Sequence, residues 1–261
     1  MAFELGLEGK VVVITGGASG IGFATAVEFA RQGAKVAICG RTVGKLMKAK
    51  EQMQEQGLDV YTEALDICDV EKFYAFGDHV CDMFGRLDIW INNAGVSITK
   101  PFLEFTDEEW DTVMNINLKA VFHGCQYAVR KMIEQGHGGV ILNAASFQAV
   151  MPAAAAVPYG ASKAAVVSLS RTLAGELAVH NIRVLSYIPG VISTPMADEW
   201  LNETNQIQNI PSDRYGRPED LANALVFVAS DRASYINGVH IDVTGGKFCV
   251  QNPRYSYTNQ T

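Results

Sequence analysis

Long hydrophobic runs, a basic excess and paired cysteines are all missing from this 261-residue sequence. It has no run of about 18 apolar residues, and its first residues lack the charged-then-apolar pattern of a secretion signal, so we expect no membrane span and no export. The net charge of −7 argues against nucleic acid or an anionic membrane surface as a partner. The five scattered cysteines form no CxxC pair, which indicates free thiols in the cytoplasm rather than disulfides or a metal site.

Repeats, low-complexity segments and Pro/Gly/Ser-rich linkers are also absent, which predicts one domain over residues 1–261. Apolar strand-like runs alternate with stretches of helical periodicity. The predicted strands are 10–15, 34–39, 58–64, 87–91, 139–144, 182–187 and 239–243. The predicted helices are 21–32, 42–56, 69–84, 107–134, 158–179 and 218–229. This alternation predicts an α/β fold, a doubly wound, mostly parallel seven-stranded sheet with helices on both faces.

The turn after the first predicted strand is rich in glycine. Residues 15–22 read Thr-Gly-Gly-Ala-Ser-Gly-Ile-Gly, with the spacing TGxxxGxG. A turn of this kind lets the backbone approach a pyrophosphate, whose charge then lies at the positive end of the following helix. We therefore predict a dinucleotide site, with a tight turn that needs glycine for positive φ as the alternative.

A second pattern lies in residues 158–163, which read Pro-Tyr-Gly-Ala-Ser-Lys. Tyr159 and Lys163 are four residues apart, so on a helix they project from the same face. A neighbouring cation favours the ionised form of a phenol. The pair is therefore suited to moving a proton at the carbonyl or carbinol oxygen of a substrate. By itself this spacing is also common on solvated helix faces.

With both motifs present, residues 8–246 resemble the short-chain dehydrogenases/reductases. The resemblance implies a Rossmann fold and an NAD(P)-dependent oxidoreductase that interconverts a secondary alcohol and a ketone. It assigns the catalytic role to Asn117, Ser146, Tyr159 and Lys163. It implies cofactor contacts from Gly16, Ser19, Gly20, Ile21, Gly22, Arg41, Asp66, Ile67, Asn93, Ala94, Gly95, Tyr159, Lys163, Pro189, Gly190, Ile192 and Thr194. In this role Lys163 lowers the pKa of Tyr159 and contacts the nicotinamide ribose.

Two of the catalytic positions also allow a purely local interpretation. Ser146 follows strand 139–144, where its hydroxyl either bonds the substrate oxygen or caps a turn. Asn117 lies on an otherwise apolar helix stripe, and a buried amide must be hydrogen-bonded. It either satisfies nearby backbone or holds a water that links Lys163 to solvent, and we favour the water. The histidines show no ligand spacing, so no metal is predicted.

Cofactor choice depends on the end of the second strand, Cys39-Gly40-Arg41. An NAD-preferring turn usually carries an acidic residue there for the ribose 2′-hydroxyl. Arg41 instead offers a cation that can pair with a 2′-phosphate, so we predict NADP and leave NAD open. Ser19 departs from this pattern, because many NADP-using relatives carry a basic residue at that position.

Substrate and assembly are predicted more coarsely. Residues 190–216 form a long irregular stretch of the kind that covers substrates, and residues 247–261 resemble the tail of some bacterial hydroxysteroid dehydrogenases. We expect a small alcohol or ketone, hydroxysteroid-like and alicyclic. Sugar or polyol oxidation, 3-oxoacyl reduction and a non-catalytic dinucleotide sensor remain alternatives. An acidic acyl carrier would need a basic docking patch, of which Arg130 and Lys131 supply little.

The resemblance also implies a homotetramer or homodimer assembled through the two long helices. An apolar outer stripe would be needed for that contact. Its predicted members are Val121, Cys125, Val129, Val166, Leu169, Ser170 and Leu173.

Overall fold

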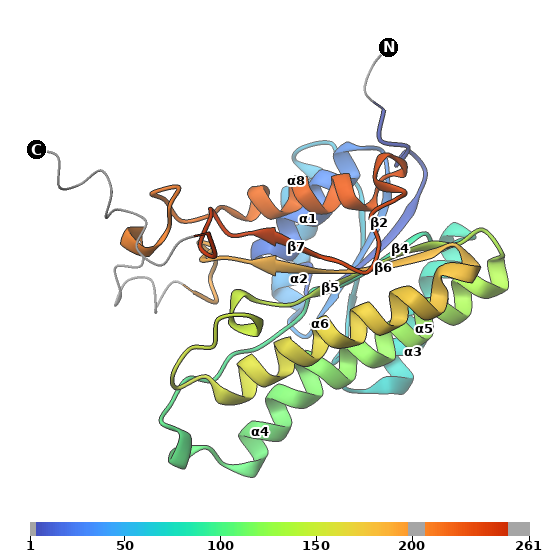
Figure 1. The fold of residues 1–261 in the computed structure, drawn as a ribbon. Coiled ribbons are helices and arrows are strands. Elements are labelled where there is room, and N and C mark those ends of the chain that lie inside the picture. Colours follow the sequence, from blue (N-terminus) through green and yellow to red (C-terminus); the bar gives the residue numbers. More distant parts are fainter. Residues whose placement is uncertain (1–3, 198–206, 250–261) are drawn as a thin grey trace, which may run out of the picture.

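The computed structural model describes residues 4–197 and 207–249, which form a seven-stranded sheet with helices on both sides (Figure 1). The strand order is β3-β2-β1-β4-β5-β6-β7, and every neighbouring pair is parallel. The strands are β1 Val11–Thr15, β2 Lys35–Gly40, β3 Val60–Ala64, β4 Ile89–Asn92, β5 Gly139–Ala144, β6 Ile182–Pro189 and β7 His240–Val243. The predicted doubly wound seven-stranded sheet is confirmed, with all strands parallel.

The helices divide between the two faces of the sheet. They are α1 Gly20–Arg31, α2 Val43–Gln54, α3 Val70–Phe84, α4 Asp107–Met114, α5 Ala120–Gln135, α6 Val157–Leu177 and α8 Pro218–Ala229. Helices α1, α2 and α8 enclose one hydrophobic core with the sheet, and α3, α5 and α6 enclose the other. Figure 1 shows α1 beside α8, with α5 and α6 on the opposite side of the sheet.

Strand β1 explains why the apolar runs of this sequence are continuous rather than alternating. Val12 and Ile14 enter one core, and Val11 and Val13 enter the other. All four are fully buried. A parallel strand covered by helices on both faces needs apolar side chains at every position.

A buried polar network ties the ends of β4 and β5 to α6. Asn92 and Asn143 are register partners, and Asn92 Nδ2 donates to Asn143 Oδ1 over 2.8 Å. Asn143 Nδ2 donates in turn to Ser170 Oγ over 3.0 Å, and Trp90 Nε1 donates to Asn92 Oδ1 over 2.8 Å. Because each buried amide is paired, the network fixes the strand ends at low cost.

The predicted helix 107–134 is not continuous. A π-helical turn, Asn115–Lys119, separates α4 from α5. Within this turn Asn117 is fully buried, and its amide bonds both the N–H and the C=O of Val96. The wide turn thus accommodates a tertiary contact, which the helical periodicity of the sequence does not encode.

The predicted outer stripe of the long helices is wrong for four of its members. Val121, Cys125, Val166 and Ser170 are at most 3 % exposed and lie inside this subunit. An apolar helix stripe indicates a buried face, and here that face packs on the sheet. Val129, Leu169 and Leu173 are partly buried against the same core. Assembly into a tetramer or dimer stays a prediction.

Two predicted segments reach beyond the described residues. The irregular stretch predicted to cover the substrate, 190–216, includes residues 198–206, and the tail, 247–261, includes residues 250–261. These residues lie outside the described part of the chain.

Among the described helices none combines the length and the apolar character needed to cross a membrane. The described residues also contain no group of three or more His, Cys, Asp or Glu side chains placed to hold a metal ion.

Replacing Gly22 tests the close packing of α1 against the glycine-rich turn. A Cβ at this position would lie 2.4 Å from the carbonyl oxygen of Gly16 and 2.5 Å from Asn93 Nδ2. We expect Gly22→Ala to lower the free energy of unfolding by about 1–3 kcal/mol in urea titrations, because neither neighbour can move freely. Gly44→Ala is the matched control, since nothing lies within 4 Å of its Cβ. That helix substitution should raise stability by about 0.5–1 kcal/mol. Equal effects at the two sites would contradict this packing.

Candidate active site

A cavity of about 340 Å³ opens at the carboxyl ends of strands β1 to β6. In doubly wound sheets this edge, near the switch in strand order, is where ligands bind. Fourteen of the predicted cofactor residues line it: Gly16, Ser19, Gly20, Ile21, Arg41, Asp66, Ile67, Asn93, Ala94, Gly95, Tyr159, Lys163, Pro189 and Thr194. The structure therefore brings together residues that are far apart in the sequence, from Gly16 to Thr194.

Three predicted cofactor residues do not line this cavity. Gly22 lies behind the glycine-rich turn, against Gly16 and Asn93. Gly190 packs on Thr244, whose Cα would be 2.7 Å from a Cβ at this glycine. Ile192 is 6 % exposed in the hydrophobic core and borders a different cavity. These three shape the backbone around the site rather than its surface.

The glycine-rich turn suits the pyrophosphate of a dinucleotide. Gly16 has φ +66°, and a Cβ there would lie 2.9 Å from Cα of Ala94, so only glycine fits. Ser19 precedes α1, and its side chain makes no capping hydrogen bond. The first turn of α1 therefore presents backbone N–H groups and the positive end of the helix dipole to the cavity. A dinucleotide cofactor fits these residues.

Hydrogen bonds around Asn93 hold the floor of the cavity. Thr15 Oγ1 accepts from the backbone N–H groups of Asn93 and Ala94, each over 3.0 Å. Asn93 Nδ2 donates back to the carbonyl oxygens of Thr15 and Gly16, and Tyr187 Oη donates to Asn93 Oδ1 over 3.0 Å. Sequence reasoning missed Tyr187, which lies near the end of β6 and belongs to none of the motifs.

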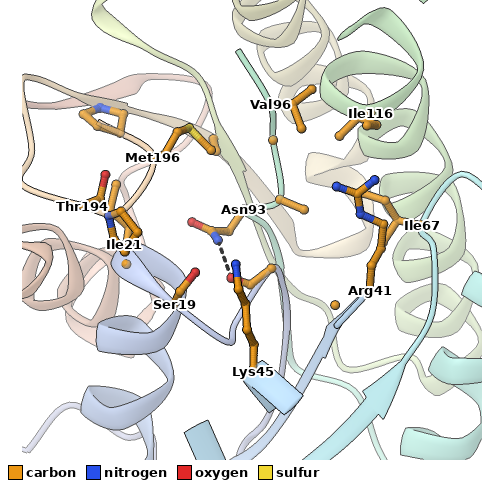
Figure 2. A pocket seen from close by; sticks show the side chains of 18 of the residues that line it. Ser19, Ile21, Arg41, Lys45, Ile67, Asn93, Val96, Ile116, Thr194 and Met196 are labelled. Atoms are coloured by element: carbon orange, nitrogen blue, oxygen red, sulfur yellow. Dashed lines mark hydrogen bonds between the residues drawn. The ribbon is translucent and has the colours of Figure 1, made fainter. Parts of the chain in front are cut away.

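Two cations reach into the cavity from the end of β2 and the start of α2. Figure 2 shows Arg41 next to Ile67, with Lys45 between Arg41 and Ser19 in this view. Neither is paired with a carboxylate within the described part of the chain. Sequence reasoning found Arg41 and missed Lys45. The available signal was its spacing, because Lys45 is four residues after Arg41 and within the first turn of α2.

Helix α6 carries both Tyr159 and Lys163. It begins at Val157 with Pro158 in its first turn, which places Tyr159 and Lys163 on one face as predicted. Lys163 is only 3 % exposed, and its Nζ donates to the carbonyl oxygen of Ala144 over 2.9 Å. The same Nζ lies 5.8 Å from the centroid of the Tyr159 ring. Burial lowers the pKa of Lys163 to about 8, because a charged amine loses solvation.

The pKa of Tyr159 is shifted opposite to the sequence-based expectation. Burial of the phenol raises this pKa, and a hydrogen bond from Ser146 acts in the other direction with a smaller effect. The expected lowering by Lys163 is not found, and its Nζ instead donates to the Ala144 carbonyl oxygen. The raised pKa keeps the Tyr159 phenol protonated at neutral pH. Ser146 also accepts from Gln148 N over 3.2 Å, so its local capping role is present too.

The side-chain amide of Asn117 makes three direct hydrogen bonds to the protein. Its Oδ1 accepts from Val96 N, and its Nδ2 donates to Val96 O, both over 2.8 Å. Nδ2 also lies 3.3 Å from Ser162 Oγ. The local backbone interpretation thus describes its observed bonds, and the water-holding role stays a prediction. Asn117 and Lys163 both lie close to Gly95. A Cβ built on Gly95 would lie 3.2 Å from Asn117 Oδ1 and 3.4 Å from Lys163 Nζ.

Comparison with known proteins decides the family. Residues 10–205 match the family described as short chain dehydrogenase. The chain belongs to the short-chain dehydrogenase/reductase family. It is 38 % identical over 245 residues to the 3-oxoacyl-[acyl-carrier-protein] reductase of Thermotoga maritima, with 92 % of this chain and 98 % of that protein covered. It is also 38 % identical over 243 residues to a 3alpha-hydroxysteroid dehydrogenase of Mediterraneibacter gnavus, with 92 % and 97 % covered.

A solved structure of this family shares the fold closely. The short-chain type dehydrogenase/reductase from Mycobacterium marinum superposes with a TM-score of 0.91 at 32 % identity, covering 95 % of this chain and 98 % of that one. The protein is an NAD(P)-dependent oxidoreductase of this family. Relatives with the same identity act on different substrates by name, so the overall likeness does not determine the substrate.

The depressed pKa of Lys163 predicts a pH-dependent gain in stability. The native state loses this proton near pH 8, whereas the unfolded chain keeps it to the ordinary value of 10.5. Between these pH values the unfolded state binds more protons, so the stability of the wild type rises with pH relative to Lys163→Met. From pH 7.5 to 10.5 we expect a relative gain of about 3 kcal/mol in the free energy of unfolding, measured in urea. A difference that stays constant over this range would show an unperturbed amine.

Proposed function

We propose that this protein interconverts a secondary alcohol and a ketone with NADP(H), using Tyr159 as the acid and base. The observation that carries the proposal is the position of Tyr159 and Lys163 on the wall of the dinucleotide cavity, with Ser146 bonded to the phenol. When bound, the cofactor supplies the hydride for reduction or accepts it in oxidation. The glycine-rich turn, the loop at Asn93 and the Arg41 side chain would hold it.

Tyr159 would move the proton that balances this hydride. In the reductive direction its phenol donates a proton to the ketone oxygen, and in oxidation the phenolate takes the proton of the carbinol. The Ser146 hydroxyl would donate a hydrogen bond to the same substrate oxygen and stabilise its developing charge. Lys163, with its pKa lowered to about 8, can return a proton towards Tyr159 near neutral pH. Asn117 would position this pair through Val96 and Ser162.

NADP preference is supported by the two cations at the other end of the cavity. Arg41 and Lys45 both line it without a carboxylate partner within the described residues. Together they can form charge-assisted hydrogen bonds to a 2′-phosphate, which NAD lacks. Lys45 supplies the second cation that Ser19 does not provide.

For the substrate we propose a hydroxysteroid-like alicyclic alcohol or ketone, in line with the name of the Mediterraneibacter gnavus relative. The Thermotoga maritima relative favours 3-oxoacyl reduction as the second candidate. Against that candidate, Lys131 is paired with Asp78 over 2.9 Å, which leaves Arg130 as the single arginine or lysine of α5 available to an acidic carrier. We also propose a single-domain cytoplasmic enzyme that assembles as a homotetramer or homodimer.

Tyr159→Phe tests the proton-transfer role. The substitution removes only the phenolic oxygen, so kcat should fall by ~10²- to 10⁴-fold while the cofactor still binds. Steady-state assays with a panel of alicyclic ketones give kcat, and fluorescence titration with NADPH gives binding. Tyr235→Phe is the matched control, because Tyr235 is fully exposed. Near-normal kcat in Tyr159→Phe would overturn the assignment.

Arg41→Ala tests cofactor choice. Loss of one charge-assisted contact should reduce kcat/KM for NADPH by roughly 10- to 100-fold and change that for NADH little. Lys45→Ala should act in the same direction, and added salt should weaken NADPH more than NADH. Arg130→Ala, at an exposed position on α5, serves as control. Equal losses for both cofactors would make Arg41 structural, and a wild type that prefers NADH would contradict the NADP proposal.

A further inference from the structure

Three charged side chains are buried in the described part of the chain: Asp88, Lys163 and Lys247. Two of them are accounted for. Asp88 accepts hydrogen bonds from Val11 N and from the Arg86 guanidinium. Lys163 belongs to the proton-transfer pair. Lys247, at 9 % exposure, has no role in the fold or in the site described so far.

Lys247 lies at the same edge of the sheet as the active site. It follows β7 in a turn closed by Lys247 N to Thr244 O and by Cys249 N to Gly246 O. This turn is anchored by Gly190 N, which donates to Val243 O, and by Ser212 N, which donates to Gly245 O. Because β7 is parallel to β6, the turn lies beside the segment that ends β6.

The side chain of Lys247 reaches from β7 towards the segment that follows β5. Its Nζ lies 5.1 Å from the centroid of the Phe147 ring. Phe147 comes immediately after Ser146, the residue proposed to bond the substrate oxygen. In the sheet β6 lies between β5 and β7, so the ammonium extends across the end of β6. Lys247 does not itself line the cavity, but its contact with Phe147 places the cation beyond Ser146, at the opposite end of the sheet edge from Arg41 and Lys45.

This ammonium has no carboxylate partner within residues 4–197 and 207–249. Its contact with the Phe147 ring offsets only part of the lost solvation, and burial lowers the pKa of Lys247. Next to Phe147, the buried Oε1 of Gln148 also lacks a hydrogen-bond partner among the described residues. Natural proteins retain unsatisfied polar groups of this kind mainly at functional sites.

We propose that Lys247 binds a carboxylate carried by the substrate and thereby selects an acidic ketone or alcohol. This inference rests on the proposed function and names the substrate class more closely, an alicyclic compound with a carboxylate away from the reacting carbon. The single positive charge and the three N–H donors of an ammonium match one carboxylate. A phosphate dianion would leave a net negative charge there. Gln148 Oε1 can accept a hydrogen bond from a hydroxyl of the same substrate.

The test compares matched substrates that differ only in charge. The probes are 4-oxocyclohexanecarboxylate and a 3-oxosteroid carboxylic acid, each beside its methyl ester, assayed with NADPH. In the wild type kcat/KM should favour each acid over its ester by about 10-fold or more. In Lys247→Met the ratio of kcat/KM for the acid to kcat/KM for the ester should approach one. The loss should appear as a higher KM for the acid. Lys247→Arg should retain part of the preference, and Lys48→Met, at an exposed lysine of α2, should keep all of it.

Several results would overturn the inference. An unchanged acid-to-ester ratio in Lys247→Met, or equal losses for acid and ester, would show that the side chain only packs on Phe147. If Lys247→Met does not fold, the absence of any acid preference in the wild type would overturn the inference equally. A preference for dihydroxyacetone phosphate over every acid would assign the cation to phosphate instead. Failure of all ketones, acids and esters alike, would contradict the proposed function itself.

Discussion

The candidate active site depends on one buried ammonium. Lys163 Nζ is held at the end of β5 by the carbonyl oxygen of Ala144, and it is almost fully withdrawn from solvent. A charged amine in such a place is costly unless it is hydrogen-bonded, so the carbonyl of Ala144 must stay in position. The polar network of Asn92, Asn143 and Ser170 fixes the ends of β4 and β5. Gly95, without a side chain, leaves room for the ammonium beside Asn117.

The same cavity separates two electrostatic tasks. At one end Arg41 and Lys45 offer positive charge in a protein whose net charge is −7. At the other end burial lowers the pKa of Lys163, so that this amine can lose its proton closer to neutral pH. Burial also raises the pKa of Tyr159, which keeps the phenol protonated. A local cationic patch within an acidic protein concentrates one phosphate-bearing ligand without general attraction to polyanions. Charge and proton chemistry are therefore arranged along a single groove.

The sheet, the glycine-rich turn and the Tyr159–Lys163 pair could be predicted from sequence, because buried parallel strands are continuously apolar and both motifs act at fixed local spacing. Other features depend on tertiary contacts. The π-helical turn places Asn117 in hydrogen-bond contact with Val96, and nothing in the local sequence specifies that partner. The stripe with Val121 and Val166 faces inward, because periodicity shows an apolar face but not what covers it. The direction of the Tyr159 pKa shift depends on burial, which spacing does not reveal.

Titration of Lys163 in the folded enzyme tests the central claim most directly. Lysine labelled with ¹³C at Cε reports the ionisation of each amine by NMR, and Lys163→Met assigns the signal. An ammonium buried against the Ala144 carbonyl predicts a pKa of about 8, well below the ordinary 10.5. A signal that titrates at the ordinary value would mean that this amine is solvated. Proton return from Lys163 to Tyr159 near neutral pH would then have no physical basis.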